Sequence, residues 1–122
     1  PYADIIGMSG FNFGPNTVLH PNLTWQSFDQ IFLGTYTTLA GAFPGKPLII
    51  ASTSCAESGG NKAAWIRDMA ARLAAGYGRL SAVFWFDIDK RAQGEADWRI
   101  DSSQASLQAI QAMYADPNLW AP

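Results

Sequence analysis

Side chains suited to sugar chemistry follow three apolar runs in this 122-residue sequence. Asn12 and Glu57 come after the first and second runs, and Trp85 and Asp87 close the third. A flat aromatic face with polar groups at its rim is the composition of a sugar-binding groove. Two carboxylates about 5 Å apart would instead cut a glycosidic bond with retention. Sugar binding is therefore one interpretation of these residues, and core filling by the aromatic side chains is the other.

Apart from Trp85, the other four of the five tryptophans divide into two groups by position. Trp65 lies on an apolar helical stripe and Trp120 near the end of the chain, so we expect both to pack internally. Trp25 and Trp98 fall in segments after apolar runs, where stacking on sugar is the alternative to core packing.

The three apolar runs predict buried strands. They are DIIGMS (4–9), PLIIAS (47–52) and SAVFWFD (81–87), and none alternates with polar residues. Continuous runs of this length are typical of parallel strands that are covered on both faces.

A helix signature follows each run. Ser27 with Gln30 forms a capping box, and Asn61 and Ser103 are the later caps. Gly and Pro residues end the helices at 44–45, 76–78 and 116–117.

Three strand–helix repeats predict an α/β fold with parallel strands and right-handed crossovers. The segments after the strands are long (10–26, 53–60 and 88–102) and the returns are short, which favours part of a (β/α)₈ barrel over a doubly wound sheet. We expect one partial-barrel domain over 1–122, with units at about 1–43, 44–78 and 79–122. An additional strand between Gly14 and Trp25 would make four units.

Three or four units cannot close a barrel of eight strands, and they leave open edges and an apolar face. We therefore expect self-association, with a dimer favoured. The sequence starts at Pro1 without a methionine and reaches a strand almost at once, so we also expect a piece of a longer chain.

Charge and composition exclude several partners. The net charge is −2 and there is no basic run, so no nucleic-acid partner is expected. No apolar stretch approaches the ~20 residues that cross a bilayer, so no membrane partner is expected. Cys55 and His20 are each the only residue of their type. We therefore predict no disulfide, no metal site and no cofactor.

Four segments together resemble glycoside hydrolase family 26, the mannanase and lichenase group. DIIGMSGFNFG (4–14) is similar to the family's sixth strand, and KPLIIASTSCAESGGNKAAWIRD (46–68) to its seventh strand and helix. AVFWFDIDK (82–90) and DWRIDSS (97–103) are similar to its eighth strand and the loop that follows. The resemblance covers nearly the whole chain. It implies the C-terminal part of a (β/α)₈ barrel, a polysaccharide or oligosaccharide partner, and an extracellular or periplasmic location.

The family's catalytic residues do not carry over. Ser52 stands where the resemblance implies the nucleophilic Glu, and Phe11 stands where it implies the Tyr that holds that Glu. The acid/base belongs to a strand that this sequence lacks. The resemblance therefore implies a non-catalytic β-glycan-binding half-barrel. The alternatives are a fragment or nucleophile mutant of a retaining endo-β-glycanase, and an assembly domain without a ligand.

The resemblance also implies which residues contact sugar. Trp85 matches the aromatic floor of the sugar subsite, and Phe11 and Phe13 match other aromatic positions. Asn12, Asp87, Glu57, Trp25 and Trp98 complete the expected binding set. Glu57 is a weak catalytic candidate, with a loop or substrate-contact role as its alternative. For Asp87 and Asp89, ion pairs with Lys90, Arg91 or Arg99 are the favoured alternative.

Overall fold

The computed structural model describes residues 2–15 and 18–120, and it confirms the α/β class. Three parallel strands in the order β1-β2-β3 alternate with three long helices. The strands are β1 (Ile6–Asn12), β2 (Leu48–Cys55) and β3 (Leu80–Trp85). The helices are α1 (Phe28–Ala42), α2 (Lys62–Gly76), α3 (Gln104–Ala115) and the short α4 (Pro117–Trp120), with a 3₁₀ turn at Arg91–Gln93. Among the described residues between Gly14 and Trp25 there is no fourth strand.

The predicted caps start the helices as expected. The Ser27 hydroxyl accepts from the Gln30 amide at 3.2 Å, and the Gln30 side chain accepts from the Ser27 amide at 2.8 Å. Asn61 and Ser103 likewise accept from the third residue of their helices. Helix α4 was not expected from the sequence, although Pro117 occupies the first helical position that proline favours.

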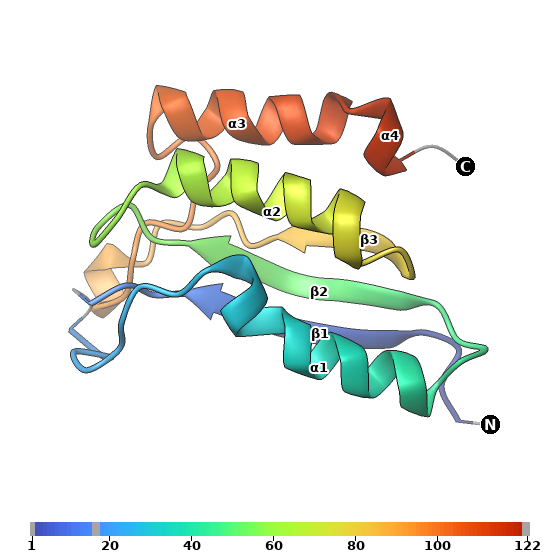
Figure 1. Cartoon of the computed structure of the whole chain (residues 1–122). Helices are drawn as coiled ribbons and strands as arrows, with labels where there is room; N and C mark the ends of the chain where they lie inside the picture. Colours follow the sequence, from blue (N-terminus) through green and yellow to red (C-terminus); the bar gives the residue numbers. More distant parts are fainter. Residues whose placement is uncertain (1, 16–17, 121–122) are drawn as a thin grey trace.

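All three long helices lie on one side of the sheet (Figure 1). The core fills the space between them and the strands, with Phe28, Ile50, Ile66 and Met69 fully enclosed. A doubly wound sheet carries helices on both faces, whereas a barrel wall carries them on its outer face only. The arrangement is therefore that of a barrel-wall segment.

The opposite face of the sheet is open in this chain. Gly7, Ser9 and Ala51 are exposed there, and Phe84 keeps 55% of its surface accessible. The apolar runs are typical of strands covered on both faces, and three units were expected to leave one apolar face open. The isolated chain has this open face. Each apolar run is continuous in the sequence because the open face of the sheet also consists of small and apolar residues.

A β-bulge interrupts β2 at Ala51 and Ser52. Strand β1 pairs Met8 with Ile50 but Ser9 with Ser52, so β2 contains one extra residue. The Cys55 side chain is part of the helix-side core, and alternation from that residue places Ser54 and Ser52 on the open face. Bulges redirect side chains. Here the bulge sets the direction of the residue at the expected nucleophile position.

The two ends of the sheet differ. Segments 13–15, 18–27, 56–61 and 86–103 follow the strands and gather at one end, which we call the carboxyl edge (Figure 1). Short returns at 43–47 and 77–79 lie at the other end. Barrel enzymes build their functional sites at the carboxyl edge.

Candidate functional site

An aromatic group at the carboxyl edge, here called the edge cluster, consists of Phe11, Phe13, Phe86 and Trp98. Phe11 lies at the centre, with its ring centroid 5.6 Å from that of Phe86 and 5.4 Å from that of Trp98. Trp98 is only 1% exposed, whereas the three phenylalanines are partly exposed. The accessible aromatic surface of the edge cluster is therefore provided by its phenylalanine rings, and Trp98 supports them.

Asn12 is fully buried and its amide is already engaged. The side-chain oxygen accepts from the Gln26 backbone amide at 2.9 Å, and the side-chain nitrogen donates to the Cys55 sulfur at 3.3 Å. Asn12 therefore ties the loop after β1 to the end of β2. Burial raises the pKa of the Cys55 thiol to about 12, so this cysteine stays protonated at neutral pH.

Glu57 belongs to a hydrogen-bonded network between β2 and α3. Its carboxylate accepts from the Ser102 hydroxyl at 2.7 Å and from the Ser106 hydroxyl at 2.9 Å. Burial alone raises the pKa of Glu57, but these hydrogen bonds and a nearby ammonium charge outweigh it, and the net pKa lies below the usual value. An ionised Glu57 is a poor proton donor at neutral pH. The network favours a structural role, and a catalytic role remains an untested alternative.

Lys62 supplies that ammonium charge and is 1% exposed. It donates to the Arg99 carbonyl at 2.7 Å and to the Ser102 hydroxyl at 2.8 Å. It thereby fixes the loop after β3 to the start of α2. Lys62 was not among the expected site residues, although the sequence contains one signal for it. A lysine at the first position of a helix faces the positive end of the helix dipole, which is unfavourable unless a tertiary contact compensates.

Trp85 lies on the helix-covered side of the sheet, packed against the main core. Its indole nitrogen donates to the Trp98 carbonyl at 2.7 Å, and the Lys62 ammonium lies 5.6 Å from its ring centroid. The ring is still partly exposed, so a sugar contact by Trp85 stays a prediction. Trp25 lies apart from the edge cluster, in a groove between the N-termini of α1 and α2. Trp65 is buried as expected.

The acidic residues after β3 have different partners. Asp89 pairs with Arg91 at 2.7 Å, as the ion-pair alternative predicted, and this pair lowers its pKa. Asp87 is exposed and accepts from the Ile100 backbone amide at 2.7 Å. Asp87 thus remains accessible at the carboxyl edge.

Ser52 has no activating partner among residues 2–15 and 18–120. No side chain there forms a hydrogen bond with its hydroxyl, and His20 is exposed with its ring 4.6 Å from that of Phe13. A serine hydroxyl is a weak nucleophile without an adjacent base. The described residues therefore do not form a nucleophile pair around Ser52.

A polar pocket of about 310 Å³ adjoins the edge cluster through Ala96. Its charged lining consists of three carboxylates and one guanidinium, from Glu57, Glu95, Asp97 and Arg91. Lys90 pairs with Glu95 at 2.6 Å and Arg99 with Asp97 at 2.7 Å, which holds the pocket in shape. This acidic lining disfavours an anionic ligand.

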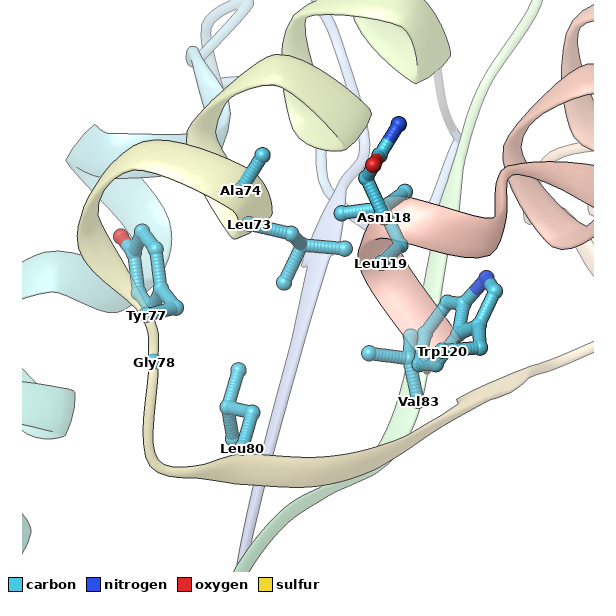
Figure 2. Close-up of a pocket in the computed structure, with 9 residues that line it drawn as sticks. All are labelled: Leu73, Ala74, Tyr77, Gly78, Leu80, Val83, Asn118, Leu119 and Trp120. Atoms are coloured by element: carbon cyan, nitrogen blue, oxygen red, sulfur yellow. The ribbon is translucent and has the colours of Figure 1, made fainter. Parts of the chain in front are cut away.

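Another pocket, of about 280 Å³, lies near the short helix–strand return (Figure 2). Side chains from the end of α2, from β3 and from α4 point into it, among them Leu73, Leu80 and Trp120. This is the end of the sheet at which barrel residues serve stability. We therefore place the candidate site at the carboxyl edge.

The described residues contain no cluster of metal-binding side chains, and none of the described helices is long and apolar enough to cross a membrane. No family model matches this chain. The chain is 41% identical over 108 residues to Endoglucanase H of Acetivibrio thermocellus, a glycoside hydrolase. The match covers 88% of this chain, and the chain spans 11% of the length of that relative. This α/β chain is therefore similar to one part of an endoglucanase.

Proposed function

We propose that the carboxyl edge of this chain binds a neutral β-glycan and does not cleave it. The single observation that carries the glycan-binding part of the proposal is the similarity to Endoglucanase H over 88% of the chain. A match of that length necessarily includes β2, α2 and β3. Membership of glycoside hydrolase family 26 is part of the same proposal and rests on the segment resemblance.

The site geometry supports binding through the half-exposed rings of the edge cluster. Phe11, Phe13 and Phe86 offer apolar faces, and Asp87 and the acidic pocket beside them offer hydrogen-bond acceptors for sugar hydroxyls. Asn12 and Trp98 are enclosed, so we propose that they position the rings without contacting the ligand.

The arrangement at Ser52 argues against hydrolysis by this chain alone. Retention needs a carboxylate nucleophile and a second carboxyl group as acid/base. Ser52 lies on the open face of the bulged strand, and Phe11 is its diagonal neighbour in the β1–β2 register. Neither side chain supplies a carboxylate.

Calorimetry with cellohexaose and mannohexaose tests the proposal. Phe13→Ala should weaken binding of either sugar about tenfold, because Phe13 is a half-exposed ring of the edge cluster. Phe43→Ala is the matched control, since Phe43 is 39% exposed and lies beyond the end of α1, away from the carboxyl edge. Absence of heat from both sugars with folded protein would leave the proposal without support.

A second candidate is one part of a longer catalytic barrel, and the 11% coverage of Endoglucanase H favours it. Mixing this chain with the missing barrel strands would then produce glucan hydrolysis, and the double change Ser52→Glu with Phe11→Tyr would raise it. No gain from that double change would argue against a latent site.

The open sheet face requires a cover, and we propose that a second copy supplies it when the chain is isolated. Exposed Ile5 and Phe84, each 55% accessible, lie on or beside this face, and β1 and β3 each have one unpaired edge within the described sheet. Light scattering at micromolar concentration should give a dimer, and a strict monomer would contradict this. If Trp85 and Phe84 were enclosed by that second copy and no glycan bound, the chain would be an assembly domain. An extracellular or periplasmic location remains a proposal from the resemblance.

A further inference from the structure

A shallow groove of about 390 Å³ lies between the N-termini of α1 and α2, outside the edge cluster. Its lining combines the Trp25 indole with the side chains of Gln30, Asn61, Ala64 and Asp68. These residues come from the two helices and the loops that lead into them, so the groove is formed within this chain and does not depend on a covered sheet face.

Trp25 is held firmly in this groove. The Gly60 backbone packs against its indole so closely that a Cβ at Gly60 would lie 2.5 Å from the ring. The Cβ of any residue at Gly14 would also lie near the same ring, at 3.5 Å. An aromatic ring with a fixed orientation loses little entropy when a ligand stacks on it.

The polar groups around Trp25 have unused hydrogen-bonding capacity. Gln30 and Asn61 use their side-chain oxygens in helix caps, which leaves the amide NH₂ groups as donors. Asp68 is exposed, and its carboxylate has no ion pair among the described residues. An apolar face flanked by two NH₂ donors and a carboxylate acceptor matches the alternating CH faces and hydroxyls of a pyranose.

We propose that this groove is a second carbohydrate-binding site, which takes one or two neutral pyranose units of a glycan chain. The ligand class rests in part on the proposed function, but the site uses none of the edge-cluster residues. A single ring in an open groove binds weakly, with a Kd on the order of 1 mM.

Titration of the whole chain with cellopentaose and with mannopentaose, followed by amide and indole NMR shifts, tests the site. Saturable shifts of the Trp25 indole and of the Asn61, Ala64 and Asp68 amides are expected by about 10 mM sugar. Ala64→Arg places a long side chain in the groove and should raise the Kd obtained from these shifts about tenfold. Ala71→Arg is the control, because Ala71 is exposed two turns further along the same face of α2.

Asp68→Ala provides a second variant that removes an exposed acceptor without touching the core, and it should also weaken the groove shifts. Shifts confined to segments 13–15, 56–58 and 86–98 would overturn the second site and leave the proposed function standing. Shifts confined to the groove would support the second site and contradict binding at the edge cluster. Equal affinity of the Ala64→Arg and Ala71→Arg proteins would also overturn the second site.

Discussion

Lys62 fixes the loop after β3, so its replacement tests how the carboxyl edge is held together. Lys62→Met keeps the length and apolar stem of the side chain but removes the buried ammonium. Two short hydrogen bonds are lost, to the Arg99 carbonyl at 2.7 Å and to the Ser102 hydroxyl at 2.8 Å. The attraction between the ammonium and the Trp85 ring at 5.6 Å is lost with them.

The expected cost follows from opposing effects. Each charge-assisted bond contributes about 1.5–3 kcal/mol, and the ring contact about 1 kcal/mol. The methionine variant avoids the desolvation cost of several kcal/mol that burial of an ammonium ion carries. We expect a net loss of about 2 kcal/mol in the free energy of unfolding. We also expect faster amide exchange at residues 97–102.

Urea unfolding followed by tryptophan fluorescence measures this loss. Lys90→Met is the matched control, since Lys90 forms a half-exposed ion pair with Glu95. This substitution should lower the free energy of unfolding by only about 0–1 kcal/mol. If Lys62→Met were as stable as the wild type, or more stable than Lys90→Met, the role given to Lys62 would be wrong.

Three further predictions concern the same edge. The pKa of Glu57 is lower in the folded state than in the unfolded state. Its ionised form therefore stabilises the fold fully above the unfolded pKa of about 4.3. This stabilisation is lost as the pH falls through the folded pKa. The stability advantage of the wild type over Glu57→Gln should therefore be constant between about pH 5 and 7 and shrink below about pH 4 in urea titrations. The Cys55 thiol, with its pKa raised to about 12 by burial, should resist iodoacetamide at pH 8 in the folded chain and react once urea unfolds it; rapid alkylation of the native chain would contradict its burial. Trp98→Ala should lower the unfolding free energy by about 3–5 kcal/mol, because the 1%-exposed indole fills the edge cluster, and a loss under about 1 kcal/mol in calorimetric unfolding would show that the cluster is not packed as described.

Local signals in the sequence predicted the helices well. Capping residues such as Ser27 and Asn61 act through atoms only three residues away, so their effect does not depend on the rest of the fold. The parallel order of the strands also followed from the repeated strand–helix pattern. The position of the three long helices on one side of the sheet (Figure 1) then favoured a barrel wall over a doubly wound sheet.

The directions of side chains at the carboxyl edge could not be predicted in the same way. The bulge at Ala51 and Ser52 depends on register with two neighbouring strands, and it determines which face the following residues occupy. The sequence did not reveal that Trp85 packs on the helix-covered side, next to Thr53 of β2, and its contact with a sugar stays a prediction. The position of Lys62 at the start of a helix was a signal, but its partners could not be predicted, because they are backbone carbonyls more than 30 residues away in sequence.

Equilibrium dialysis of the chain against cellohexaose and mannohexaose, with the length of the sugar analysed on both sides, tests the central claim most directly. We predict a saturable excess of intact hexasaccharide on the protein side and no shorter products. Equal sugar concentrations across the membrane with folded protein, or shortened sugars whose formation stops in Ser52→Ala or Glu57→Gln, would contradict binding without cleavage.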